Sequence, residues 1–141
     1  MSRRAIFLPV LLALIVAMAA ACSGGSQAGG APGGNAANGQ KLFTSGKGSA
    51  PPCSGCHSVT AGQVLVGPSL SGIATQAAQQ LKDPNYKGQA KTAEDRIREC
   101  IVSPNTYVVP GFQPNVMYAN YGKDLTSSDI DDLVAYLTTL K

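Results

Sequence analysis

The chain has 141 residues, which is the length of one domain. It carries 11 lysines and arginines against eight acidic residues, and only 13% of its residues are charged. With so few charged residues, the chain is not expected to form the basic surface that binds the phosphate backbone of a nucleic acid. We therefore expect no nucleic-acid partner. The only histidine is His57, which excludes His-rich metal clusters, and the sequence contains neither a Walker glycine loop nor an H-E-x-x-H motif.

Residues 1–21 have the layout of a secretory leader. Arg3 and Arg4 supply positive charge near the N-terminus, and an apolar run of 17 residues follows, ending at Ala21. A membrane-spanning helix needs about 20 such residues, so the run is short for one. We therefore expect a signal peptide or membrane anchor, and export to the periplasmic or extracytoplasmic face of a bacterial membrane.

Cys22, directly after this run, has three interpretations. Residues 19–22 resemble a bacterial lipobox, which makes Cys22 the lipidation site of a lipoprotein, and this is the interpretation we favour. The same residues fit ordinary signal cleavage and soluble export, or the leader stays uncleaved as an N-terminal helix in the membrane. Residues 22–34 are rich in Gly, Ala and Ser, and such a flexible linker spans about 17–21 Å. The folded domain is therefore expected over residues 35–141.

Helix signals occur in this domain at residues 35–44, 92–102, 126–140 and, more weakly, 73–81. Asn35 is a candidate N-cap for the first segment. Thr92 with Asp95, and Thr126 with Asp129, have the spacing of capping boxes. No stretch alternates as a half-buried strand does, so we expect an all-α domain of three to four short helices.

Residues 53–57 read Cys-Ser-Gly-Cys-His, which is the C-x-x-C-H sequence of haem c attachment. Two thiols at this spacing can add to the two vinyl groups on one edge of a haem. The histidine that follows can then take an axial position on the iron. We therefore expect one haem c, bound covalently through Cys53 and Cys56, with His57 as a metal ligand.

Two other uses of these residues are less favourable. Zinc could draw on Cys53, Cys56, His57 and Cys100, but the adjacent Cys56 and His57 are an awkward pair on one ion. A thioredoxin-type dithiol needs a βαβ surround that the chain lacks. Cys100 instead falls on the apolar face of the segment 92–102 and is expected to be a small core thiol.

Met117 is the candidate for the sixth iron ligand by elimination. Met1 and Met18 lie in the leader, and Met117 sits in an irregular loop rather than on a helix face. His/Met ligation raises the reduction potential and leaves no vacant site for a substrate. This favours a one-electron carrier rather than an enzyme. If Met117 stays off the iron, the alternative is an open-site haem peroxidase or gas sensor.

Across residues 35–141 the chain resembles class I cytochrome c. Gly39 and Phe43 match the first-helix G-x-x-x-[FY] of that family, and Tyr136 matches the aromatic residue of its last helix. The resemblance implies a cytochrome c-like fold around the haem, in which these two helices cross in contact. Met117 matches the distal ligand of the P-x-x-M loop.

Residues 67–70 match the G-P-x-L of the same family. The resemblance implies that the Pro68 carbonyl accepts a hydrogen bond from the second ring nitrogen of His57 and so orients the ring. It also implies that partners dock at the exposed haem edge near Cys53 and Cys56.

The stretch 103–117 is similar to haem c domains of oxidase subunit II and to the monohaem lipoprotein subunit of alternative complex III. This implies a membrane-tethered carrier between respiratory or photosynthetic partners, which are membrane redox complexes or other electron carriers. The alternative is a haem c subunit fixed within a larger complex. Tyr107, Tyr118 and Tyr121 flank the Met117 loop and are expected to pack there as amphipathic side chains, with a hydrogen bond from one of them to a haem propionate as the alternative. Arg96 and Arg98 are expected on a solvated face of mixed charge, with ion pairs to the haem propionates as the alternative.

Overall fold

The structure is a computed structural model that describes residues 33–141. The expected leader at 1–21, Cys22 and the linker up to residue 32 lie outside the described residues. Within residues 33–141, no helix combines the length and the apolar character that crossing a membrane requires.

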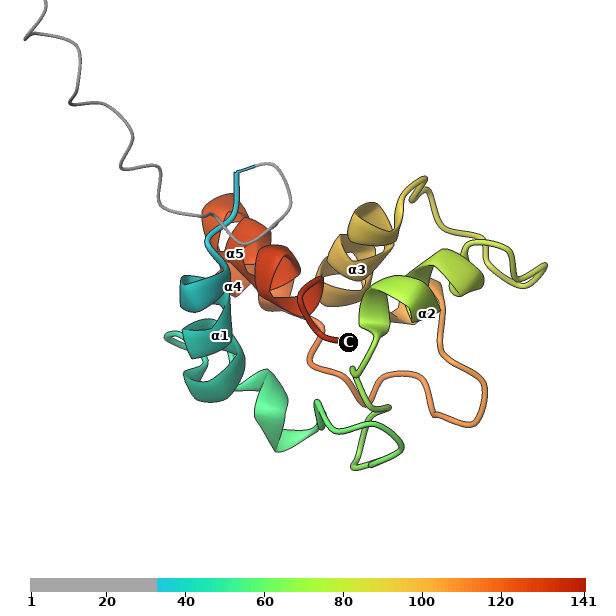
Figure 1. Ribbon diagram of the computed structural model, residues 1–141, viewed down its shortest axis with the longest axis horizontal. Helices are drawn as coiled ribbons and strands as arrows, with labels where there is room; N and C mark the ends of the chain where they lie inside the picture. Colours follow the sequence, from blue (N-terminus) through green and yellow to red (C-terminus); the bar gives the residue numbers. More distant parts are fainter. Residues whose placement is uncertain (1–32) are drawn as a thin grey trace, which may run out of the picture.

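The described chain is all-α, which confirms the predicted fold class. It has five α-helices and two short 3-10 turns, and its only β contact is an isolated bridge between Lys47 and Ala50. The elements in chain order are α1 (Ala36–Ser45), a 3-10 turn (Cys53–Gly55), α2 (Ile73–Gln80), α3 (Ala93–Val102), a 3-10 turn (Pro104–Thr106), α4 (Tyr121–Asp124) and α5 (Ser127–Leu137). Figure 1 shows α1 and α5 on one side of the domain, and α2 and α3 on the other. The four-residue α4 was not predicted.

The helices begin at the predicted caps. The Asn35 side chain accepts hydrogen bonds from the amides of Ala37 and Asn38 in the first turn of α1, at 3.0 and 3.1 Å. Thr92 with Asp95 and Thr126 with Asp129 form complete capping boxes at α3 and α5. Each cap satisfies amides that a helix leaves without partners, and loss of one typically costs about 1 kcal/mol.

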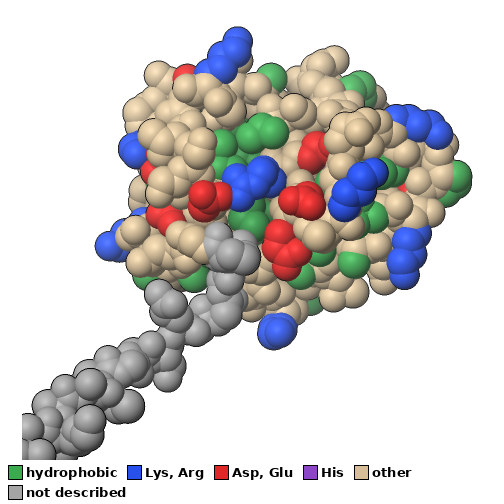
Figure 2. Space-filling model, turned by 90° about the horizontal axis from the view of Figure 1, so that it is seen from above, with side chains coloured by type: hydrophobic (Ala, Val, Ile, Leu, Met, Phe, Trp, Pro, Cys, Tyr) green, Lys and Arg blue, Asp and Glu red, His purple; other side chains and the backbone are tan. Residues whose placement is uncertain are grey.

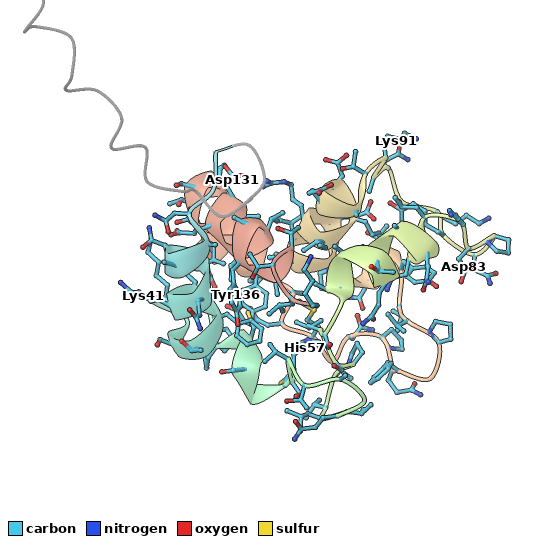
Figure 3. All side chains as sticks on the ribbon, in the orientation of Figure 1. Lys41, His57, Asp83, Lys91, Asp131 and Tyr136 are labelled. Atoms are coloured by element: carbon cyan, nitrogen blue, oxygen red, sulfur yellow. The ribbon has the colours of Figure 1, made fainter. Side chains whose placement is uncertain are left out.

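The terminal helices α1 and α5 cross in close contact, as the resemblance implied. The Phe43 and Tyr136 rings are 5.5 Å apart between centroids, and Figure 3 shows Tyr136 between the two helices. A Cβ atom at Gly39 would lie 2.8 Å from the Cβ of Tyr136 and nearer still to the carbonyl oxygen of Asp132. Only glycine allows this approach.

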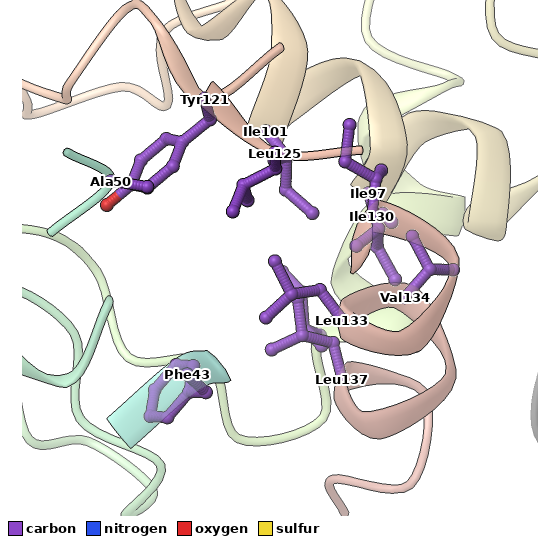
Figure 4. Close-up of a cluster of buried hydrophobic side chains, with 12 residues drawn as sticks. Phe43, Ala50, Ile97, Ile101, Tyr121, Leu125, Ile130, Leu133, Val134 and Leu137 are labelled. Atoms are coloured by element: carbon purple, nitrogen blue, oxygen red, sulfur yellow. The ribbon is translucent and has the colours of Figure 1, made fainter. Parts of the chain in front are cut away.

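The core joins α1, α3 and α5. Figure 4 shows Phe43 of α1 below Leu133 and Leu137 of α5, with Ile97 and Ile101 of α3 opposite. Leu133 is 1% exposed. Burying aliphatic and aromatic side chains of this size stabilises the fold by about 1.5–3 kcal/mol each.

The prediction that Arg96 lies on a solvated face is wrong. Its side chain is 1% exposed, and its guanidinium carbon lies 5.3 Å and 5.1 Å from the ring centroids of Tyr86 and Tyr107. Nη2 donates to the Tyr107 carbonyl at 3.3 Å, and Nη1 lies 3.5 Å from the Glu99 carboxylate. The helix pattern misses this burial because the two rings come from loops outside α3. Arg98 does remain partly exposed, at 37%.

Candidate haem site

A cavity of about 550 Å³ opens between the C-x-x-C-H segment and the loop that ends at Met117. Its volume is within the range of about 300–1,000 Å³ that is usual for cofactor pockets. A smaller hollow of about 100 Å³ continues it inward, and both are lined by Cys53, His57, Pro68, Val109 and Met117. With Cys56, which lines the larger cavity, all five haem-site residues predicted within the described chain lie together. Cys22 is outside the described residues.

The attachment motif is folded by a tight turn. The 3-10 turn Cys53–Gly55 follows Pro52, and the amides of Cys56 and His57 both donate to the Cys53 carbonyl, at 3.1 and 2.9 Å. The turn places two thiols and the imidazole on one wall of the cavity. Burial raises the pKa of the Cys53 thiol, so without haem this thiol is neutral at physiological pH.

The imidazole of His57 packs against the segment that contains Gly67 and Pro68. Its Nδ1 lies 2.9 Å from the Pro68 carbonyl oxygen, as the resemblance implied. Because a carbonyl only accepts, Nδ1 carries the proton, and the Nε2 lone pair is free to bind a metal. Gly67 packs against the ring: a Cβ atom there would lie 2.8 Å from Nδ1 and 3.0 Å from Nε2. The G-P-x-L segment therefore fixes both the tautomer and the position of the ring.

Met117 reaches the cavity from a closed loop. The amide of Asn115 donates to the Asn105 side chain at 2.8 Å, which joins the two ends of the loop. Gly111 has φ +92° and Asn115 has φ +61°, and asparagine tolerates this left-handed region better than most side chains. This clasp was not predicted, because it joins residues ten apart and no short sequence pattern indicates it.

The inner wall is made from the core itself. Side chains of α1, α3 and α5 that belong to the core cluster also line the smaller hollow; they include Phe43, Ile97, Ile101, Leu133 and Leu137. The cavity therefore offers apolar walls, two thiols on one side, and an imidazole nitrogen and a thioether sulfur as iron donors. These residues fit a covalently bound haem c.

The zinc alternative receives no support. Among residues 33–141, no group of three or more His, Cys, Asp or Glu side chains is arranged to hold a metal ion. Cys100 is half-buried and lines the smaller hollow, and burial raises the pKa of its thiol. It is therefore neutral and unreactive, as a core thiol is expected to be.

The tyrosines near the Met117 loop are engaged within the protein. The Tyr107 hydroxyl donates to the Asp83 carboxylate at 2.6 Å, and the Tyr118 hydroxyl donates to the Asp124 carboxylate at 2.5 Å. The Tyr121 hydroxyl donates to the Pro51 carbonyl at 2.9 Å. Each phenol proton already has an acceptor, so the structure gives no support to a propionate contact. Burial raises the pKa of Tyr121, which keeps its proton and the bond to Pro51 in place.

The helical domain matches a known protein family. The family described as Cytochrome c matches residues 36–141, which is the whole helical domain. The chain belongs to the cytochrome c family. Cytochrome c2 iso-2 of Magnetospirillum molischianum is 32% identical over 94 residues, covering 63% of this chain and 91% of the relative. Cytochrome c2 iso-1 of the same organism is 33% identical over 95 residues, covering 63% and 90%.

Family membership confirms the class I c-type resemblance and the haem c cofactor. It also supports haem-based electron transfer as the general activity of this cytochrome c. The match covers the domain that holds the cavity, and residues 1–35 lie outside it.

Proposed function

We propose that this cytochrome c carries single electrons on one haem that is attached through Cys53 and Cys56 and ligated by His57 and Met117. When bound, the haem supplies an iron that alternates between the ferric and ferrous states. The observation that carries the proposal is the shared cavity. His57 and Met117 come from separate segments and line the same two connected hollows.

The chain's own residues have distinct tasks in this proposal. Pro68 holds the proton on Nδ1 of His57, and Gly67 keeps the ring close to the segment behind it. The clasp between Asn105 and Asn115 fixes the loop that presents the Met117 sulfur. With His57 and Met117 as its two protein ligands, the iron would have no site left for a substrate. The protein then acts as a carrier and not as an enzyme.

We also propose that the carrier is exported and tethered. The basic and apolar layout of residues 1–21 supports export to the extracytoplasmic side, and Cys22 supports lipid attachment. A linker over 22–34 would let the domain move between membrane redox complexes or other electron carriers. A fixed place within one larger complex is the second candidate. Release of the haem protein from membranes by Cys22→Ala would support the lipid anchor, and retention would contradict it.

The variant Met117→Ala tests the ligand set. We expect it to keep its covalent haem, to bind CO, and to lose reduction potential on the order of 0.1 V, a part of the roughly 0.8 V that axial ligands span. Val59→Ala, at an exposed position that lines neither hollow, is the control and should keep the original potential. An unchanged potential in Met117→Ala would remove Met117 as a ligand.

A further inference from the structure

Arg96 is the only lysine or arginine among residues 33–141 that the fold buries. It is 1% exposed, whereas every lysine in this part of the chain is exposed and the side chain of Arg98 is 37% exposed. Figure 2 shows lysine, arginine and acidic side chains interspersed on the face seen from above, where water and opposite charges screen them. The charge of Arg96 is screened much less and therefore acts over a longer distance inside the protein.

The charge of Arg96 is only partly compensated. Nη2 donates one hydrogen bond, to the Tyr107 carbonyl at 3.3 Å, and Nε and Nη1 have no hydrogen-bond partner in the described chain. The Glu99 carboxylate lies 3.5 Å from Nη1. It already accepts hydrogen bonds from the Tyr86 hydroxyl at 2.6 Å and from the Gln89 amide at 2.9 Å. Glu99 is thus shared among three groups, and the guanidinium keeps part of its positive field.

The positive end of this ion pair faces the haem site. Tyr107, whose ring centroid lies 5.1 Å from the guanidinium carbon, lines the larger cavity, and Cys100 lines the smaller hollow. Burial raises the pKa of the Cys100 thiol, and the nearby charge of Arg96 lowers this pKa in part. Glu99 and its partner Tyr86, by contrast, line neither hollow. Arg96 itself lines neither hollow, so its effect on the cavity is electrostatic.

One further carboxylate approaches the same wall. Asp83 accepts a hydrogen bond from the Tyr107 hydroxyl at 2.6 Å, and it belongs to the loop between α2 and α3. Its chain neighbours Lys82 and Pro84 are exposed, so water screens the charge of Asp83 more than that of Arg96. The buried cation is therefore the dominant charge behind Tyr107.

We propose that the buried guanidinium of Arg96 raises the reduction potential of the haem. This rests on the proposed function, because it assigns a residue that sets the energy at which the carrier accepts its electron. Ferric haem carries one positive charge more than ferrous haem, so a fixed cation nearby disfavours the ferric state. The polarity and burial of the surroundings are among the means by which a protein sets the potential of a haem. Arg96 therefore adds to the effect of the axial ligands without binding the iron.

The test is a spectroelectrochemical titration of the full-length haem-loaded protein, which measures the ratio of ferrous to ferric haem at a fixed ambient potential. We expect Arg96→Gln to lower this ratio by at least about threefold, which is about 28 mV for a one-electron couple. Arg98→Gln removes the same charge from a half-exposed position on the same helix, and it should change the ratio by less than about 1.5-fold. An unchanged ratio in Arg96→Gln would overturn the proposal.

Two more variants separate the effect of charge from that of loosened packing. Glu99→Gln removes the counter-ion, so we expect it to raise the ratio by about twofold, and its sign tests the proposal even if Arg96→Gln fails to bind haem. Tyr86→Phe removes hydrogen bonds to Glu99 and Ala90 but no charge, and it should change the ratio by less than about 1.5-fold. Loosened packing would instead lower the ratio in all three variants, because water stabilises the ferric charge. That result would overturn the proposal.

The original protein, measured in the same titration, tests the proposed function separately. A carrier is expected to give a reversible one-electron curve, and its absence would contradict the electron-carrier function itself. If the original protein gives that curve and the Arg96 and Glu99 variants shift in the wrong direction, only the role of Arg96 fails. The two failures are therefore distinguishable.

Discussion

At the scale of single residues, the neighbours of His57 determine the tautomer and the position of its ring. The Pro68 carbonyl, 2.9 Å from Nδ1, holds the proton on that nitrogen, and this leaves the Nε2 lone pair free to bind a metal. Gly67 contributes by lacking a side chain, since a Cβ would meet the ring. The Pro68 contact was predicted from the family resemblance that G-P-x-L carries, whereas the packing of Gly67 against the ring was not predicted.

Arg96 was the residue whose environment the sequence did not reveal. Its neighbours on α3 are charged, which favoured a solvated face, but Tyr86 and Tyr107 cover it from two loops. The residue pattern of a helix does not predict that side chains from distant loops will cover one of its residues. Nε and Nη1 of this guanidinium have no hydrogen-bond partner in the described chain, so stacking on the rings carries much of its stabilisation.

Replacing Arg96 therefore tests the description of this buried cation. We expect Arg96→Gln to lower the unfolding free energy of the haem protein by about 3 kcal/mol, because Glu99 loses its buried partner and both rings lose the cation. Chemical denaturation followed by circular dichroism measures this. Arg98→Gln, which breaks a half-exposed pair with Asp131, is the matched control and should cost less than about 1 kcal/mol. Equal losses would contradict the assignment.

At the scale of elements, helix ends and helix crossings were predicted better than loops. Capping boxes are local, so Thr92 and Thr126 indicated where α3 and α5 begin. The clasp between Asn105 and Asn115 joins residues ten apart, and no short pattern announces it. The short α4 likewise has no side-chain cap to signal its start.

The crossing of α1 and α5 depends on Gly39. Gly39→Ala adds a methyl group that meets the Asp132 carbonyl and Tyr136, so the helices must separate. We expect a net loss of about 1–3 kcal/mol, despite the better helix propensity of alanine. Thermal unfolding of the haem protein measures it. For comparison, Gln40→Ala on the exposed side should change stability by less than about 0.5 kcal/mol, and a Gly39→Ala protein as stable as that control would contradict the close packing.

The start of α5 predicts a pH dependence. Hydrogen bonds from Lys47 and Thr126 lower the pKa of Asp129 in the folded protein. Its stabilisation is therefore complete above about pH 4, the pKa of an unfolded aspartate, and is lost as the pH falls through the lower folded value.

Asp129→Asn should accordingly cost about 1 kcal/mol at pH 7, and the difference from the original protein should shrink below about pH 4. Urea titrations across this pH range measure both. The exposed Glu94→Gln is the control, with a change within about 0.5 kcal/mol. A difference that grows in acid would show that the sign is wrong.

At the scale of the whole molecule, the haem completes the core. The smaller hollow is lined by the same side chains that form the hydrophobic cluster, so without haem these groups face empty or hydrated space. The all-α class and the starts of three helices were within reach of the sequence, because they depend on local patterns. The burial of Arg96 is a property of the assembled fold, because the rings that cover it come from loops outside α3.

A haem-free chain should therefore be largely unfolded. Changing both attachment residues, Cys53→Ala and Cys56→Ala, prevents covalent loading. We expect its circular dichroism to lack the helical content of the haem protein and to show no cooperative thermal transition. The haem protein measured alongside should melt cooperatively. A cooperative transition in the haem-free chain would show that the apolar core suffices by itself.

The most direct test of the central claim is the optical spectrum of the purified haem protein, ferric and ferrous, before and after addition of CO. Ligation by His57 and Met117 predicts a weak long-wavelength sulfur-to-iron band in the ferric state and no change of the ferrous spectrum with CO. A high-spin ferric spectrum and a ferrous spectrum that shifts with CO would show an open iron site. That result would contradict the electron-carrier account and favour an enzyme or gas sensor.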